Sequence, residues 1–459
     1  MSQPACTRFC HLAARTIDRI AVALPILYLA WALPLLLVVA LTTPPWQNPD
    51  EAAHMLRISQ IAHGGLVAYR FDNTAGGYAD PAIIASAATT SRVIFHPEQK
   101  VTLGMLSRAG AAQWGSTAEL PFPAIAMYAP VLYVPAVLAV EAGRVLGLSV
   151  VHSLFAVRMV NAVAATLIAG LALYFARSTR LALAVLLVLP MTVAMFASAA
   201  QDGLMIALTL LVVACVDRAV AEDRDPTLWE TVAIGVATAA VIIARPPYLP
   251  LAALPLIAVQ RGRRRAWWNV AAICAVSAVW IAYTFASVSV PLQADFNPKA
   301  QLLHFLQQPW SFVPLLANTL LSLHSDYTVT FIGVLGWLDT FLLPSYYDAA
   351  SLVLLAGLAS VTIGPTRRTW LALLIWLAAV GAVLFAGYLS WTPPQADRIE
   401  GVQGRYFLPL AAVLAMAVPT WRSFGVIVRR PAVVALLGLA VITPAIIVHA
   451  LILRFYLVP

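Results

Sequence analysis

The chain has 459 residues, of which 61% are hydrophobic and only 10% are charged, and its formal net charge is +8. This composition excludes an ordinary soluble protein and describes a chain that lies mostly in lipid. Because the positive charge falls in short clusters between apolar segments, it indicates membrane topology, and no nucleic acid partner is expected. Apolar runs of roughly 17 to 25 residues predict a single all-α transmembrane domain over residues 1–459.

Basic clusters predict how this domain is threaded, because short cytoplasmic loops are enriched in Arg and Lys. They lie at residues 8–19, 177–180, 218–224, 261–265, 367–368 and 422–430. With the N-terminus in the cytoplasm, about 11 helices place every cluster on that side. The expected spans are 20–42, 156–176, 181–201, 204–220, 229–245, 246–260, 266–290, 345–363, 369–390, 405–421 and 431–453.

Two large extracytoplasmic regions follow from this threading, at residues 43–155 and 291–344. The apolar segment 122–148 is expected to form a re-entrant or surface-lying helix, since an extra crossing would move the cluster 177–180 to the outside. Three prolines within it and Pro121 just before it also suit an interrupted, peripheral helix. An ordinary extra span remains the alternative. A substrate site is expected in the outer regions, because the predicted cytoplasmic loops are short.

An acidic motif begins the first outer region, directly after the first span. Residues 44–57 predict a helix start, with Asn48 as the cap, Pro49 at the first helical position and Glu51 completing a capping box. On such a helix Asp50, His54 and Arg57 share one face, and Glu51 lies on the neighbouring face.

The acids of this motif have two interpretations. They complement the helix dipole, with His54 and Arg57 solvated at the rim, or they form part of a site. Their place at the membrane surface, beside a titratable histidine and a fixed cation, favours the site. A carboxylate that the helix N-terminus keeps ionised is available to accept a proton from a hydroxyl group.

Further polar residues lie at the other helix ends that are expected on the outer side. They are Arg158, Gln201 to Gly203, Arg245 to Tyr248, Gly336 to Thr340 and Gly401 to Tyr406. Each segment alone is typical of a turn, a cap or an interfacial aromatic. Together, their carboxylates and arginines predict a binding site for an anionic lipid-linked substrate. The candidate substrate-binding residues are His54, Arg57, Asp202, Arg245, Asp339, Gln403, Arg405 and Tyr406.

The same segments carry a family resemblance that extends from about residue 43 to residue 420. The matching segments are Pro49-Asp50-Glu51-x-x-His54-x-x-Arg57, Met191 to Gly203, Leu335 to Thr340 and Gly401 to Pro409. This ordered set resembles a bacterial family of predicted membrane proteins of unknown function. That family is similar to the GT-C superfamily of glycosyltransferases, which includes protein mannosyltransferases and aminoarabinose transferases. Residues 128–133 resemble their Pro-Pro-Leu-x-Tyr segment, although the paired prolines are lost.

The resemblance implies a helical bundle of GT-C type, with surface-lying helices in the first outer loop. It implies an inverting glycosyltransferase of the bacterial inner membrane that moves a sugar from a polyprenyl-phosphate donor to a glycan, lipid or protein acceptor. The active site would face the periplasm or the exterior. Asp50 would be the general base, with Glu51 as its neighbour or substitute, and Asp202 would help bind the acceptor or the sugar.

Arg245 or Arg405 is expected to bind the donor phosphate, because both are positively charged and both are expected at the outer side of the membrane. No group of residues with convincing metal-ligand spacing is present, so metal independence is expected, and a divalent metal stays open. No cofactor beyond the donor substrate and membrane lipid is implied. The alternatives are a transporter or flippase of a lipid-linked sugar and a non-catalytic subunit of an envelope polysaccharide system. Sugar, acceptor and oligomeric state are not readable.

Overall fold

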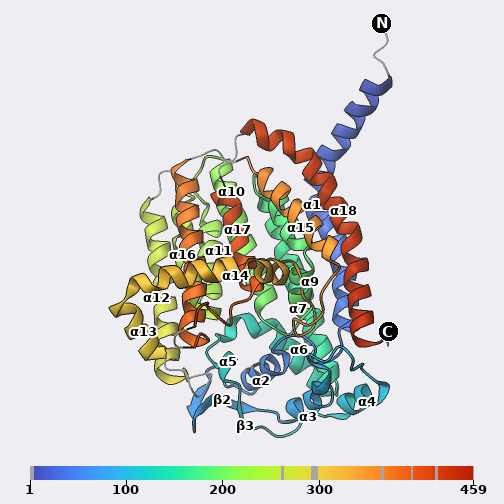
Figure 1. The fold of residues 1–459 in the computed structure, drawn as a ribbon, viewed down its shortest axis with the longest axis vertical. Helices are drawn as coiled ribbons and strands as arrows, with labels where there is room; N and C mark the ends of the chain where they lie inside the picture. The colour runs from blue at the N-terminus through green and yellow to red at the C-terminus, as the bar shows by residue number, and fades with distance from the viewer. Residues whose placement is uncertain are drawn as a thin grey trace.

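The computed structural model describes residues 5–259, 263–290, 298–362, 366–393, 396–418 and 422–457, with side chains from residue 19 in the first helix and from residue 424 in the last. The chain is predominantly helical (Figure 1). Within the described ranges, six helices contain segments long and apolar enough to span a membrane. They are α1 (Ala5–Thr42), α7 (Val150–Phe175), α10 (Asp202–Ala221), α12 (Arg263–Ser287), α16 (Arg367–Ser390) and α18 (Arg422–Phe455). Membrane-spanning helices are therefore confirmed as the main architecture.

Other expected spans are shorter or broken. Residues 181–201 form two helices, α8 (Arg180–Val188) and α9 (Pro190–Phe196), because Pro190 lacks the N–H that a continuous helix needs. Residues 246–256 form a 3-10 segment, η3 (Pro246–Leu256), with prolines inside it and at its start. The prediction of one α-helix in each place is wrong. The remaining bundle helices are α11 (Leu228–Ala244), α15 (Pro344–Ala359) and α17 (Leu408–Ala417), the last preceded by η5 (Gly404–Phe407).

Residues 43–149 form a layer at the end of the bundle opposite the N-terminus (Figure 1). Its helices are α2 (Glu51–Ala62), α3 (Ala82–Ala88), η1 (Ser91–Val93), α4 (Leu103–Ala111), α5 (Pro123–Ala126), η2 (Pro130–Tyr133) and α6 (Val134–Val145). The segment expected on the membrane surface thus becomes α5, η2 and α6, and a helix of 12 residues is too short to cross the hydrocarbon core, which needs about 20.

The layer also holds a small antiparallel sheet, which the all-α prediction did not include. Its strands are β1 (Tyr69–Phe71), β2 (Thr74–Ala79) and β3 (Ala118–Pro121), in the order β1-β2-β3, with Gly76 opposite Pro121. An apolar core that includes Trp46, Ile58 and Leu154 joins this layer to α7. The layer is therefore packed onto the bundle as one unit with it.

The second outer region contains α13 (Pro298–Gln307), η4 (Pro309–Ser311) and α14 (Phe312–Ile332), while residues 291–297 lie outside the described ranges. In Figure 1, α14 lies across the view, whereas α1 and α18 run along it. Its C-terminal part packs against η5: the Thr330 hydroxyl accepts a hydrogen bond from the Gly404 N–H at 2.8 Å. α14 thereby supports the segment that carries Arg405.

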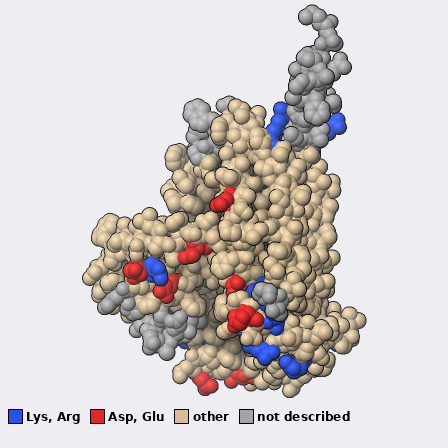
Figure 2. All heavy atoms as spheres, turned by 45° about the vertical axis from the view of Figure 1, so that its right-hand side comes forward, with Lys and Arg blue, Asp and Glu red and all other residues tan. Residues whose placement is uncertain are grey.

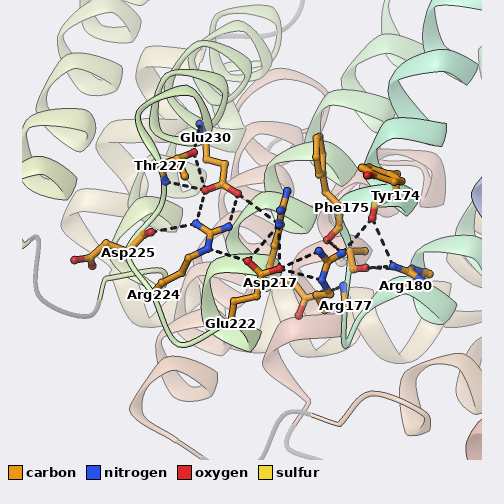
Figure 3. Close-up of polar contacts among 12 residues, drawn as sticks. Tyr174, Phe175, Arg177, Arg180, Asp217, Glu222, Arg224, Asp225, Thr227 and Glu230 are labelled. Atoms are coloured by element: carbon orange, nitrogen blue, oxygen red, sulfur yellow. Dashed lines mark hydrogen bonds and ion pairs between the residues drawn. The ribbon is translucent and has the colours of Figure 1, made fainter. Parts of the chain in front are cut away.

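Basic segments that are far apart in the sequence meet at the N-terminal end of the bundle. Arg177 and Arg218 both pair with Glu222, and Arg224 pairs with Glu222 and Glu230 (Figure 3). Part of the predicted basic set, including Arg261 and the side chains of Arg8 and Arg15, lies outside the described residues. Between the two ends, Figure 2 shows a broad face with few charged side chains, as expected of a surface in contact with lipid.

Candidate functional site

Asp50 occupies an unusual backbone position just before α2. The helix begins at Glu51, and Asp50 is its N-cap residue with φ 58°, in the left-handed region. The capping box predicted from Asn48 is therefore wrong: the Asn48 amide instead donates to Glu51 Oε1 at 3.0 Å. The Asp50 side chain is 49% exposed, and its carboxylate lies 3.7 Å from Nη2 of Arg405. It is a reachable carboxylate beside a fixed cation.

Glu51 has the opposite environment, although it is the next residue. Its carboxylate is fully buried and accepts two hydrogen bonds from the Arg158 guanidinium, at 2.8 and 2.6 Å. The Trp46 N–H donates to the same carboxylate at 3.1 Å. Both oxygens of Glu51 are thus engaged, and the residue ties the start of α2 to α7.

Arg57, expected to share a face with Asp50, is also completely buried. Its guanidinium donates to the backbone oxygens of Leu66 and Tyr128, at 2.8 and 3.0 Å, and to the Gln60 side chain. Leu66 lies in the loop after α2 and Tyr128 in the segment after α5, while Gln60 belongs to α2 itself. In the structure Arg57 holds the layer together.

Asp202 and Arg245 form an ion pair of 2.9 Å between the start of α10 and the end of α11. The Tyr406 ring lies beside two guanidinium groups, since Cζ of Arg245 is 4.4 Å and Cζ of Arg405 is 5.5 Å from its centroid. Cation–π attraction of this kind stabilises the close approach of the two like charges to one ring. The Tyr248 hydroxyl donates to the Tyr406 carbonyl at 2.7 Å and fixes the backbone here.

Two buried donor atoms in this region lack a partner. Among the described residues, neither Nη1 of Arg245 nor Nε of Arg405 has a hydrogen bond. A buried donor left unpaired typically costs about 1–3 kcal/mol. Such atoms are where an anionic ligand gains most, because its oxygens would satisfy them.

His54 lies next to these charges. Its Nδ1 is 2.7 Å from the Tyr133 hydroxyl, and its ring stacks near Tyr128 with centroids 6.3 Å apart. Burial lowers the pKa of His54 below its ordinary value, and the opposing effect of Asp202 and Asp50 is the smaller one. Burial also raises the pKa of Tyr128 and of Tyr133. The histidine is therefore neutral at neutral pH and the two phenols are protonated.

We refer to one group of side chains as the acid–arginine cluster. It consists of Asp50, His54, Asp202, Arg245, Arg405 and Tyr406. The group comes from four separate parts of the chain, and His54 is within electrostatic reach of all four charged members. Two carboxylates, two guanidinium groups and a neutral imidazole thus meet where the layer of residues 43–149 contacts the bundle.

A comparison with known protein families identifies the family of this chain. Residues 33–414 match the family described as predicted membrane protein (DUF2142), and this range contains every member of the cluster. The chain belongs to the DUF2142 family. No curated protein and no solved structure matches the chain.

Two further candidate substrate-binding residues of this DUF2142 protein, Asp339 and Gln403, are not members of the acid–arginine cluster. Asp339 pairs with Arg454 at 2.6 Å and accepts a hydrogen bond from the Phe95 N–H, so it connects the layer to the end of α18. Gln403 precedes η5, and its buried Oε1 has no hydrogen-bond partner among the described residues. Within the same residues, no group of three or more His, Cys, Asp or Glu side chains is placed to hold a metal ion.

Two contacts in the candidate site of this DUF2142 protein could not be predicted from the sequence. The Tyr133 partner of His54 was visible only as part of the segment 128–133, and Arg158 was recognised as polar but not as the partner of Glu51. The available signal was the position of Arg158 inside an apolar helix, where an ionised side chain needs a partner. Which acid would supply it depends on the tertiary fold.

Proposed function

We propose that this DUF2142 protein is a membrane glycosyltransferase of GT-C type. It would move a sugar from a polyprenyl-phosphate donor to a glycan, lipid or protein acceptor outside the cytoplasm. The observation that carries the proposal is the half-exposed Asp50 carboxylate, 3.7 Å from an arginine that retains an unpaired buried donor. The finer topology belongs to the same proposal: about 11 spans in a bacterial inner membrane, a cytoplasmic N-terminus and the acid–arginine cluster on the outer side.

In the proposed reaction, Asp50 accepts the proton of the acceptor hydroxyl group as its oxygen attacks the anomeric carbon. The bond between that carbon and the phosphate oxygen breaks, and polyprenyl phosphate leaves with the electron pair. Attack from the face opposite the leaving group inverts the anomeric configuration. Asp50 suits the role of base because it is the more accessible of the two adjacent acids, and geometry is the first requirement of a general base.

Arg245 and Arg405 would bind the donor phosphate together. Negative charge grows on the leaving phosphate in the transition state, and fixed guanidinium groups stabilise it without reorganising. Asp202 holds Arg245 through the ion pair of 2.9 Å, and Tyr406 lies beside both arginines. In this arrangement Glu51 and Arg57 are positioning residues, since their polar atoms bind other parts of the protein.

The test is native mass spectrometry of the lipids that co-purify with the wild type, with Asp50→Asn and with Asp72→Asn. Asp72 is the matched control: it is exposed, its φ is 47° and it lies in the turn between β1 and β2. A transferase without its base should retain donor, so a polyprenyl-phosphate sugar should be enriched in Asp50→Asn alone. Absence of polyprenyl lipid from all three proteins would overturn the proposal and favour the transporter or subunit alternatives.

A further inference from the structure

A second polar site lies at the other end of the bundle, away from the acid–arginine cluster. It is a cavity between the middle of α1, the start of α8, the end of α15 and the N-terminal third of α18. Three arginines line it: Arg177, Arg180 and Arg429. The hydroxyl-bearing residues that also line it are Ser178, Ser360 and Thr362. We call it the basic cavity.

The positive charge of the basic cavity is only partly balanced. Arg177 pairs with Glu222, but Arg218 and Arg224 share the same carboxylate (Figure 3). Glu230 also pairs with Arg224, so Arg177, Arg218 and Arg224 share two carboxylates, and this group keeps one excess positive charge.

Arg180 binds backbone oxygens rather than an acid. It donates to the Ala176 carbonyl at 2.8 and 3.1 Å, and it lies within electrostatic reach of Arg177, of Arg429 and of the Asp217 carboxylate. Asp217 accepts hydrogen bonds from Thr179 and from the Arg177 N–H, and it offsets only one of the positive charges. Arg429 is exposed, and within the described part of the chain its guanidinium forms no hydrogen bond or ion pair. Three cations that face one cavity repel one another unless an anion lies between them.

Exposed apolar side chains occur on both long helices that line the basic cavity. On α1, Leu27 is 43% exposed and lies three residues after the cavity-lining Leu24, on the same face. On α18, Val426 is 62% exposed and lies three residues before the cavity-lining Arg429. A ligand that combines a phosphate group with hydrocarbon chains fits this combination, whereas a soluble phosphate would use only the arginines.

We propose that the basic cavity binds the phosphate of an anionic phospholipid in the leaflet next to the N-terminal end. Basic pockets between transmembrane helices recognise such headgroups through charge and hydrogen bonds. Arg180 and Arg429 contact the phosphate, Ser178 and Thr362 donate hydroxyl hydrogen bonds, and the acyl chains lie along α1 and α18. The site does not depend on the transferase proposal, because it shares no residue with the acid–arginine cluster.

The experiment titrates the purified full chain with phosphatidylglycerol or phosphatidylcholine and counts bound lipids by native mass spectrometry. Arg429→Gln is the main variant because the side chain is exposed and its loss breaks no hydrogen bond in the described residues. We expect about fivefold weaker phosphatidylglycerol binding, the typical effect of one basic side chain near anionic lipid. The double variant R180Q/R429Q should bind weaker still.

Arg264→Gln is the matched control, since Arg264 is also exposed and belongs to the basic segment at the start of α12, outside the cavity. It should bind phosphatidylglycerol as the wild type does, and thermal unfolding of R429Q in detergent should be unchanged. Equal loss in R264Q and R429Q, or equal binding of the two lipids by the wild type, would overturn the proposal. Full displacement of the lipid by inorganic phosphate would show a soluble anion site instead.

Discussion

The side chains of Glu51 and Arg158 lie 107 residues apart in the sequence and form a fully buried ion pair with two hydrogen bonds. Arg158 also donates to the backbone oxygens of Ala40, Thr43 and Pro44. The pair therefore joins the end of α1, the start of α2 and the middle of α7. Since Asp50 precedes Glu51 directly, this contact sets the position of the proposed base.

Glu51→Gln is expected to destabilise the protein by about 3–5 kcal/mol, because it leaves the Arg158 charge buried without its counter-ion. Thermal unfolding in detergent measures the loss. The control is Glu141→Gln, which breaks the partly exposed pair with Arg144 and should cost about 1 kcal/mol or less. Similar losses in the two variants would show that burial adds nothing to the pair.

Gly404→Ala is expected to reduce both stability and the proposed transferase activity. A Cβ atom at this glycine would lie 2.0 Å from the Tyr327 carbonyl oxygen and 2.5 Å from the Phe331 nitrogen, so η5 or α14 must move, and Arg405 moves with it. Gly381→Ala is the control, as a Cβ there meets no atom within 4 Å. Unfolding and turnover are measured for both; wild-type activity in G404A would contradict the tight packing of η5.

Stability should decrease as the pH falls below about 6.5, because burial lowers the pKa of His54 in the folded protein. In that range the unfolded chain binds a proton that the folded chain does not, so acid favours unfolding, and the contribution is fully present above the unfolded pKa. Melting temperatures of wild type and His54→Gln from pH 5 to pH 8 measure it. The variant should show a smaller decrease, and parallel curves would contradict the assignment to His54.

Tyr406→Leu is expected to raise the KM for the proposed polyprenyl-phosphate donor by about tenfold, since cation–π contacts to a desolvated ring contribute up to about 2 kcal/mol. Without the ring, Arg245 and Arg405 lose the surface that lies against both of them. Tyr406→Phe keeps that ring and should behave like the wild type. If the two variants raise KM equally, the hydroxyl group rather than the ring is what matters.

The sequence predicted a predominantly helical chain with several membrane-capable helices, because long apolar runs have few alternatives in lipid. It also indicated most of the acid–arginine cluster, since Asp50, Asp202, Arg245 and Arg405 all stand at helix ends. Local patterns failed where the tertiary structure decides. The helix breaks at Pro190 and after Arg245 depend on how neighbouring helices pack around the interrupted segments.

The separation of roles among the charged residues was also beyond a local pattern. Helical spacing placed Asp50 and Arg57 on one face, but α2 begins after Asp50, and Arg57 bonds to loop carbonyls. Asp339, a candidate substrate-binding residue, pairs with Arg454. The two residues are 115 positions apart, so no local spacing rule predicts this pair. The three short strands escaped prediction because their segments have few residues and Gly76 and Gly77 weaken the strand pattern.

The left-handed backbone at Asp50 makes the two neighbouring acids non-interchangeable. Asp, Asn and Gly adopt this conformation at small cost, whereas a longer side chain such as that of Glu pays more for it. Exchanging the order of Asp50 and Glu51 would put the shorter acid out of reach of Arg158 and the longer one on the strained residue. The two adjacent acids therefore have different roles, and neither carboxylate can replace the other.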